Sequence, residues 1–405
     1  MGFRVHYSAF VAIIIIFIIA LGIYIGEIID KRVNRPLHTK SFSVKKTPKE
    51  YQNFATKDNI VKEERGIKRK SIRHKKHAHH KSSTWKRKMW KYFSMRTCKR
   101  APADFKTPSW LQQMVILIGV QKGGTKALFS FLLEHSSVAS RCNFKVSKTE
   151  SFYFDNITQY DRIDQAQLQL DYSKYMQLKC PLAVSILKRN SSKIFLDDTP
   201  AYILSSHRIP KLLNCVMPKS KMILILRNPT DRAFSHYNFY NDQNWCYEKT
   251  FDEWVDSNLE ALKVAGITNA IDPYDELLAW RRYHDNPIIR KSRKCNSFVT
   301  RGLYAIQLLH YLTALKVARR PKSDLHIIIS EQLKGDTRQA EFDKLTTSLG
   351  LPPHNLVSKE VVHATPYKVR MNATTQAKLD AFFQPYNDRL YKMMGWDPLW
   401  PVRRV

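Results

Sequence analysis

Apolar residues after position 110 form short runs that alternate with segments of helical periodicity. Four runs of four or five residues are too short for buried helices and are typical of strands covered on both faces: 114–118, 193–196, 222–226 and 325–329. Apolar positions repeat at helical spacing in 127–132, 303–315 and 379–390. Because proline removes a backbone donor, we expect the last helix to be interrupted at Pro385. Strands alternating with helices predict an α/β fold, with a P-loop-like parallel sheet flanked by helices.

A long apolar segment lies near the N-terminus. Residues 7–26 contain no Asp, Glu, Lys or Arg, and a helix of this length spans about 30 Å, the thickness of a bilayer core. The sequence therefore predicts a short tail and a transmembrane signal-anchor over 1–30, with a cleaved signal peptide or a buried core helix as alternatives. Lys31, Arg32 and Arg35 follow the segment. The positive-inside rule alone would place the region after it in the cytoplasm.

The segment between this anchor and the first strand is strongly basic. Residues 31–100 contain 24 of the 67 Lys and Arg but only 4 of the 35 Asp and Glu. Because 31–110 is poor in aliphatic residues and shows no persistent period, we predict a largely disordered stem. Its His-rich tract, 74–81, would bind metal only weakly without a fold, and the stem could hold an acidic polymer or a membrane surface. The formal charge of the chain, +32, favours acidic partners.

Glycosylation sequons and cysteines indicate the compartment in which the domain at 111–405 is located. N-glycosylation sequons begin at Asn156, Asn190 and Asn372. The six cysteines are compatible with disulfides, and we predict that Cys246 pairs with Cys295, because the two flank a polar, basic segment. These features oppose a cytoplasmic placement of the domain at 111–405.

The segment 119–126 joins the first predicted strand to a helix and reads Gly-Val-Gln-Lys-Gly-Gly-Thr-Lys. At such a junction, backbone N–H groups and the helix dipole favour an anion. Gly123 and Gly124 allow a phosphate to approach the backbone closely, while Lys122 supplies a positive charge and Thr125 a hydroxyl. The alternative interpretation is a glycine-rich turn that binds nothing.

The order of residues separates this loop from that of the nucleotide hydrolases. In those proteins Gly-x4-Gly is followed by Lys and then by Ser or Thr, whose hydroxyl holds Mg²⁺. Here Thr125 precedes Lys126, and alanine follows the lysine. This order disfavours a P-loop kinase.

A second candidate for phosphate binding follows the third predicted strand. Residues 227–237 read Arg-Asn-Pro-Thr-Asp-Arg-Ala-Phe-Ser-His-Tyr, and the Asn-Pro pair is typical of a helix start. Arg227 lies at the edge of the sheet where α/β proteins bind ligands. Arg232 and Ser235 share a helix face, and an arginine with a hydroxyl could grip a phosphate. The alternative is a solvated arginine on a capped surface helix.

These two segments resemble the donor-binding motifs of the Golgi carbohydrate sulfotransferases. The nearest types are the heparan sulfate 3-O- and N-sulfotransferases and the chondroitin 4-sulfate 6-O type, and the resemblance covers roughly 113–395. It implies that Lys122 contacts the sulfate being transferred. It also implies a set of residues that bind the 5′- and 3′-phosphates of the donor: Gly123, Gly124, Thr125, Lys126, Arg227, Ser235, Lys368 and Arg370.

The resemblance extends to the acceptor side. The segment Lys-Thr-Glu-Ser-Phe-Tyr-Phe-Asp is similar to the family's Glu-x-x-Phe-Phe-Asp, which makes Glu150 the candidate base that deprotonates a sugar hydroxyl. Asp155 is then a supporting carboxylate near the substrate. Residues 197–202 resemble the family's Glu-Lys-Thr-Pro-Ala-Tyr, which implies substrate contacts by Asp198 and Tyr202. Asp198 replaces the lysine of that segment, which disfavours a heparan 3-O specificity.

The resemblance implies a sulfotransferase that moves a sulfuryl group from 3′-phosphoadenosine 5′-phosphosulfate (PAPS) to a carbohydrate hydroxyl without a metal. It implies a single-pass type II protein of the Golgi membrane with a lumenal catalytic domain. The expected partners are the membrane and a polyanionic carbohydrate such as heparan or chondroitin sulfate, not a nucleic acid. A lumenal glycosyltransferase stays open, although the chain has no Asp-x-Asp motif to hold Mn²⁺. A non-catalytic membrane protein that binds polyanions stays open as well.

Overall fold

The computed structural model describes residues 74–94, 98–139, 142, 150–157, 163–246, 248–357, 367, 370–401 and 403. All of them lie within one compact unit, Lys68–Val405. The predicted anchor at 7–26 and the stem up to residue 73 lie outside the described residues. Within the described residues, no helix combines the length and the apolar character that a membrane crossing requires.

A five-stranded parallel sheet forms the centre of the unit. Its strand order is β3-β5-β2-β6-β7, and every neighbouring pair is parallel. The strands are β2 (Met114–Gly119), β3 (Val138–Ala139), β5 (Ile194–Asp198), β6 (Lys221–Leu226) and β7 (Leu325–Ile329). All four predicted strands are present, and the parallel sheet is confirmed. The edge strand β3 was not predicted, because two residues carry no periodic signal.

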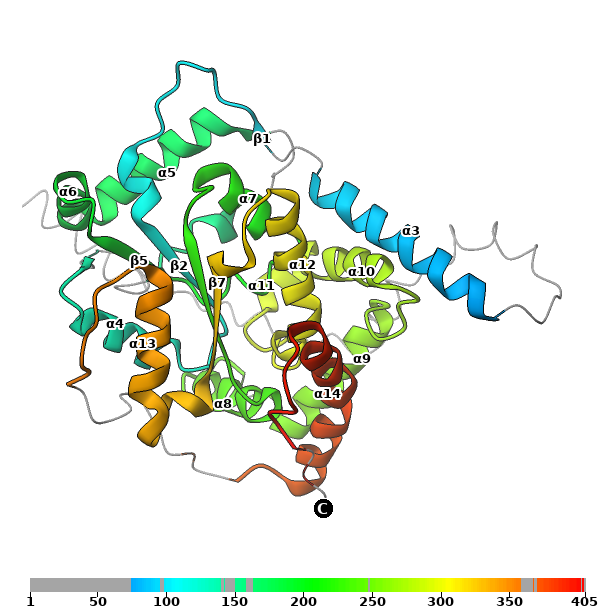
Figure 1. Cartoon of the computed structure of the whole chain (residues 1–405). Coiled ribbons are helices and arrows are strands. Elements are labelled where there is room, and N and C mark those ends of the chain that lie inside the picture. The colour runs from blue at the N-terminus through cyan, green and yellow to red at the C-terminus, as the bar shows by residue number, and fades with distance from the viewer. Residues whose placement is uncertain are drawn as a thin grey trace, which may run out of the picture. The chain divides into compact units, whose positions relative to one another are not determined.

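The side chains of β2 alternate between the two faces of the sheet. Val115 and Leu117 belong to an apolar cluster with α4 (Thr125–Glu134) and α13 (Arg338–Leu349). Ile116 and Ile118 belong to the cluster that contains α7 (Ile209–Val216) and α12 (Tyr304–Val317). Figure 1 shows these two helix pairs on opposite sides of the sheet. A strand covered on both faces must be apolar throughout, which is why its sequence shows a continuous run.

The C-terminal helix differs from its prediction. α14 (Ala373–Met394) is one helix that continues through Pro385, where an interruption was expected. A proline inside a helix costs about 3 kcal/mol. Leu379, Phe383 and Leu390 are fully buried along the same helix, and burying each such side chain is worth about 1.5–3 kcal/mol. The packing of the helix against the core therefore outweighs the lost hydrogen bond.

We predicted a largely disordered stem over 31–110. This prediction is wrong for the C-terminal part of the stem, from residue 74. Residues 74–94 form the helix α3 (His74–Ser94), which packs beside α12 and α10 (Pro273–Asp285) (Figure 1). Met89, Tyr92 and Phe93 are buried against these helices. Their apolar spacing is present in the sequence but is hidden among lysines, because only one narrow stripe of the helix faces the domain.

The remaining elements surround this core. On one edge, β1 (Cys98–Lys99) pairs with β4 (Ile163–Asp164), and α5 (Gln165–Lys179) and α6 (Pro181–Arg189) follow. Between the sheet's last two strands, the chain forms α8 (Pro229–Asn241), α9 (Phe251–Val264), α10, α11 (Pro287–Ser292) and α12. The predicted Cys246–Cys295 disulfide is present. Cys98–Cys215 and Cys142–Cys180 were not predicted, because connectivity cannot be inferred from spacing alone.

Candidate active site

The loop after β2 lies at the carboxyl edge of the sheet and is held by its neighbour β6. The N–H of Val120 donates to the carbonyl of Ile225 at 2.9 Å, and the N–H of Gly123 donates to the carbonyl of Val120 at 2.9 Å. A Cβ on Gly123 would lie 2.8 Å from the Ile225 carbonyl oxygen, so no larger residue fits there. Gly124 has φ +106° and caps α4. The loop therefore presents its backbone at the start of a helix, where an anion is favoured.

The two predicted phosphate motifs meet at this edge, because β2 and β6 are adjacent strands. Arg227 donates to the carbonyl oxygen of Lys122 at 3.4 Å. The ammonium group of Lys122 lies 4.3 Å from the ring centroid of Phe239 on α8. Burial, and to a lesser degree the charge of Arg227, lowers the pKa of Lys122. The positive charges of Lys122 and Arg227 repel each other, so an anion bound between them would be favoured.

The second arginine of the motif on α8 has a structural role. Arg232 is fully buried and donates to the carbonyls of Gln121 (3.4 Å) and Phe298. A phosphate contact by Arg232, which its position on the helix face left open, does not agree with this burial. Arg232 supports the loop from beneath instead, because a buried guanidinium must satisfy its donors within the protein. Ser235 lies on the same helix and is 6% exposed.

Lys126, predicted to hold the 5′-phosphate, forms ion pairs with two carboxylates. Its ammonium group lies 2.9 Å from Oε1 of Glu150 and 3.0 Å from Oδ2 of Asp198. Asp198 ends β5, which is the other neighbour of β2. The lysine from the loop therefore holds the candidate base beside the loop. This ion pair exists because Asp198 stands where the family resemblance placed a lysine.

Burial shapes the charges in this cluster. The pKa of Asp198 is raised to about 6, chiefly by burial and despite the neighbouring Lys126. Burial opposes the charged form of Lys126, but Asp198 and Glu150 together raise the pKa of this lysine above its ordinary value. Lys126 is therefore charged at neutral pH, and the side chain of Glu150 is only 17% exposed beside it.

The raised pKa of Asp198 gives a testable pH dependence. Between its ordinary value of 3.8 and the value of about 6 in the fold, the folded state binds more protons than the unfolded state. The free energy of unfolding therefore falls as the pH rises through this window. We expect Asp198→Asn to show a shallower fall than the wild type in urea titrations between about pH 4 and about pH 7.

Asp397→Asn is the control for this titration, because Asp397 is exposed, and its pH profile should follow the wild type. An unchanged slope in Asp198→Asn would contradict the inference that burial governs this carboxyl. Asp197, whose pKa burial also raises to about 6, keeps part of the slope in the variant.

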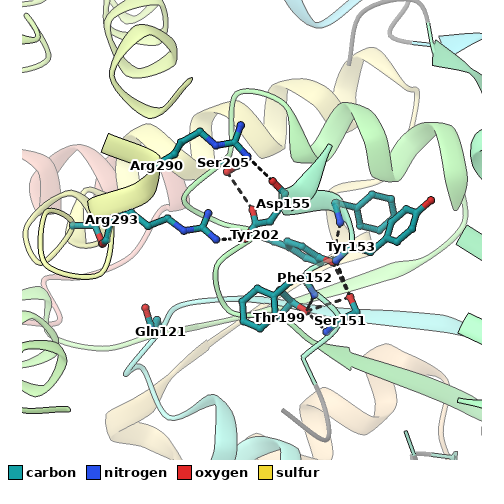
Figure 2. Close-up of polar contacts among 12 residues, drawn as sticks. Gln121, Ser151, Phe152, Tyr153, Asp155, Thr199, Tyr202, Ser205, Arg290 and Arg293 are labelled. Carbon is teal, nitrogen blue, oxygen red and sulfur yellow. Dashed lines mark hydrogen bonds and ion pairs between the residues drawn. The ribbon is translucent and has the colours of Figure 1, made fainter. Parts of the chain in front are cut away.

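The segment after Glu150 is fixed by a buried polar network. The hydroxyl groups of Ser151 and Thr199 each donate to Asp197 at 2.5 Å. The hydroxyl of Tyr202 lies 2.9 Å from that of Ser151. Figure 2 shows Ser151, Thr199 and Tyr202 converging on this point. Such a network holds the segment that follows Glu150 in one position.

The three predicted substrate contacts are all buried. The side chains of Asp155 and Asp198 are 0% exposed, and Tyr202 is 0% exposed as a residue. Direct contact with substrate, as predicted, does not agree with this burial. Asp155 instead faces Arg293, whose Nη2 lies 3.4 Å from its Oδ2, and the backbone carbonyl of Asp155 accepts from Arg290 at 2.8 Å.

Other predicted residues lie apart from this cluster or outside the description. Arg370 is exposed, and Lys368 lies outside the described residues. The sequon residues Asn156, Asn190 and Asn372 are all exposed. Asn372 also caps α14, because its side chain accepts from the N–H of Thr374 at 2.9 Å. Within the described ranges, the structure has no group of three His, Cys, Asp or Glu arranged to hold a metal.

Several residues at the site were not predicted. Gln121 donates to the hydroxyl of Tyr240 at 2.9 Å, which ties the loop to α8. Arg290 and Arg293 lie on and after α11 and reach Asp155. The only sequence signal for these arginines is the basic segment before Cys295, and a charge run alone does not show which side chains face a site.

Comparison with known proteins identifies the family. The family model described as "Sulfotransferase domain" matches residues 112–381. The chain belongs to this family. The match covers both phosphate motifs, Glu150 and the whole central sheet. It favours the sulfotransferase interpretation over a kinase or a glycosyltransferase.

Relatives of this sulfotransferase include proteins named for heparan sulfate. The chain is 30% identical over 169 residues to bifunctional heparan sulfate N-deacetylase/N-sulfotransferase 1 of Xenopus laevis. The aligned stretch covers 41% of the chain and 16% of that protein. It is 20% identical over 302 residues to human heparan sulfate glucosamine 3-O-sulfotransferase 5, covering 71% of the chain and 73% of the relative. The chain thus spans less than a fifth of the first relative's length.

Solved structures also include similar chains. A sulfotransferase from Alicyclobacillus acidocaldarius is 19% identical, with a TM-score of 0.45, over 70% of this chain and 96% of that one.

Proposed function

We propose that this chain transfers a sulfuryl group from PAPS to a hydroxyl of a carbohydrate acceptor, a glycosaminoglycan such as heparan or chondroitin sulfate. The observation that carries the proposal is the meeting of the loop at Lys122, the arginine at position 227 and the carboxylate of Glu150 at one edge of the sheet. The names of the relatives support a carbohydrate acceptor. Such convergence of an anion site and a base is what sulfuryl transfer requires.

The residues at this edge fit a nucleotide with two phosphate groups. Gly124 caps α4 and Thr125 opens it, so one phosphate would be held by the loop at this helix N-terminus. Arg227 and Ser235 would hold the other, with Arg370 and Lys368 closing over it. The donor supplies an activated sulfuryl group and a phosphate leaving group. The protein's part is to orient both ends and to offset their charge.

Residues of the chain then accept the proton and stabilise the developing charge. Glu150 accepts the proton of the acceptor hydroxyl as its oxygen forms a bond to sulfur. The bond between sulfur and the phosphate oxygen breaks, and the electron pair leaves with that oxygen. Lys122 stabilises the charge that develops there. Lys126 holds Glu150 beside the loop, since its ammonium lies 2.9 Å from the carboxylate.

The position sulfated differs, in our proposal, from that of the heparan 3-O enzymes. Asp198 stands where those enzymes carry lysine. Its carboxylate forms an ion pair with Lys126 at 3.0 Å. A positive group that would meet an acidic sugar is therefore missing at this point. The acceptor charge must be recognised elsewhere on the domain.

We further propose that the catalytic domain works in the Golgi lumen, anchored through residues 7–26. The three disulfides support an oxidising compartment. The exposure of all three sequon asparagines is compatible with glycosylation there.

The test uses the full chain with radiolabelled PAPS and a panel of acceptors: heparosan, heparan sulfate, chondroitin, chondroitin sulfate and a neutral glycan. We expect label in at least one glycosaminoglycan, and disaccharide analysis then gives the position. Calorimetry with the desulfated donor nucleotide should show one binding site. Absence of both nucleotide binding and label would refute the proposal.

A further inference from the structure

A row of aromatic rings extends from the donor loop along the end of α8. Phe239 and Tyr240 lie on the last turn of this helix with ring centroids 5.1 Å apart, and the ring of Trp245 follows 6.5 Å from that of Tyr240. Phe239 is 40% exposed and Trp245 is 54% exposed. We propose that these three residues, the aromatic row, form the surface on which pyranose rings of the acceptor stack, and that Lys294 binds an acidic group of the same sugars. This inference rests on the proposed function and names the surface that binds the acceptor.

The aromatic row begins at the lysine that the proposed function assigns to the transferred sulfate. The ammonium group of Lys122 lies 4.3 Å from the ring centroid of Phe239. Gln121, the residue before this lysine, donates to the hydroxyl of Tyr240 at 2.9 Å. Because the acceptor hydroxyl must approach the sulfur held at Lys122, a sugar in position to react would lie beside these rings.

A disulfide fixes the far end of the aromatic row. The N–H of Trp245 donates to the carbonyl of Tyr240 at 3.0 Å, which closes the turn after α8. The next residue, Cys246, is bonded to Cys295. Lys294 immediately precedes Cys295, and its ammonium group lies over the ring of Trp245 and 5.9 Å from the ring centroid of Tyr240. The disulfide therefore holds an aromatic ring and a cation next to each other.

The two ammonium groups beside the aromatic row lack a carboxylate partner. Within the part of the chain that the structure describes, no Asp or Glu forms an ion pair with Lys122 or Lys294. Burial lowers the pKa of both lysines, and the charge of a neighbouring arginine lowers each pKa further. A partly buried cation is costly unless an anion neutralises it. The donor's sulfate supplies that anion for Lys122, and an acidic group of the acceptor supplies it for Lys294.

The chemistry of the aromatic row suits an acidic sugar. A pyranose presents C–H groups on its face, and these pack against an aromatic ring, while the hydroxyl groups at its edge stay available to water and polar side chains. Stacking on Phe239 and Trp245 would remove apolar surface of both partners from water. A glycosaminoglycan combines such faces with carboxylates or sulfate esters, which match the ammonium group of Lys294.

Calorimetry with hexasaccharides of chondroitin sulfate and of heparan sulfate tests the stacking, using the full chain loaded with the desulfated nucleotide. Trp245→Ala should lower the affinity for the hexasaccharide that the wild type binds more tightly by about tenfold, because a sugar loses its aromatic surface. Trp245→Phe should recover part of the loss, since it keeps a ring. The affinity for the desulfated nucleotide should not change. Trp90→Ala is the matched control, because Trp90 is a 43% exposed tryptophan on α3, and this variant should bind like the wild type.

Lys294→Met tests the charge, because methionine keeps an unbranched apolar side chain beside Trp245 and removes the ammonium group. We expect the hexasaccharide affinity to fall by about tenfold at low salt and the loss to shrink as salt is added, since salt screens an exposed ion pair. The loss in Trp245→Ala should persist at high salt. Hexasaccharides of unsulfated chondroitin and heparosan separate the two anions: an equal loss assigns a carboxylate, and no loss assigns a sulfate ester. Lys263→Met, at an exposed lysine on α9, is the control.

Three results would overturn the aromatic row as the acceptor surface. The first is unchanged hexasaccharide affinity in both Trp245→Ala and Lys294→Met, and the second is a wild type that binds neither hexasaccharide. The third is a loss of nucleotide affinity with hexasaccharide binding intact, which would assign the rings to the adenine of the donor. A wild type that transfers sulfate to no acceptor would refute the proposed function instead, because the calorimetry measures the row without turnover.

Discussion

Glu150→Gln is expected to lower kcat by about 10²–10⁴, the usual contribution of a general base. Glutamine keeps the shape of the side chain and can still accept a hydrogen bond from Lys126, which lies 2.9 Å from Oε1 in the wild type. The variant loses only the ability to take the proton of the acceptor hydroxyl. KM for the acceptor and the affinity for the desulfated nucleotide should therefore change little. The measurement is the initial rate of sulfate transfer at saturating PAPS.

The control for this variant is Glu260→Gln, because Glu260 is an exposed glutamate on α9 and lies outside the site. Its kcat should equal that of the wild type. A Glu150→Gln enzyme with ordinary kcat, folded by circular dichroism, would show that another group accepts the proton. The assignment of Lys126 as a positioning residue would fall with it, since its proposed task is to hold this carboxylate.

Lys122→Met should lower kcat by about 10²–10³, the loss typical when one preorganised charge on a developing oxyanion is removed. Methionine preserves the packing of the chain over Phe239, where the ammonium now lies 4.3 Å from the ring centroid. The ammonium charge matters most in the transition state, so kcat should fall more than the affinity for the desulfated nucleotide. Single-turnover kinetics with radiolabelled PAPS measure this difference.

A matched control is Lys263→Met on α9, an exposed lysine far along the chain from the loop. It should leave both kcat and nucleotide affinity intact. If Lys122→Met lost affinity and kept kcat, the lysine would bind the donor equally in its ground and transition states. The role of charge stabilisation would then be wrong, while the donor site itself would stand.

The arrangement around Lys126 shows how one substitution redirects a site. Aspartate at position 198 is buried at the end of β5 and attracts the loop lysine across the gap between β5 and β2. The same lysine then holds Glu150. A group that the family resemblance assigned to phosphate binding is thus paired with the candidate base.

Much of the framework was determined by the sequence alone. Apolar runs fixed the four main strands, because a strand covered on both faces has no polar positions. The glycines at 123 and 124 indicated an anion-binding loop, because glycine lets a phosphate approach the backbone closely. The order of Lys122, Thr125 and Lys126 separated this loop from that of a kinase. These signals are local, so a single chain carries them fully.

Only the tertiary structure decided which charged groups meet. The ion pairs of Lys126 and Asp155 join residues that are far apart in the chain, and charges carry no periodic pattern that reveals a distant partner. The packing of α3 and two of the disulfides likewise depend on contacts between distant segments. Burial then turned Asp155, Asp198 and Tyr202 from predicted substrate contacts into supports, because a side chain removed from solvent must satisfy its polar atoms within the protein.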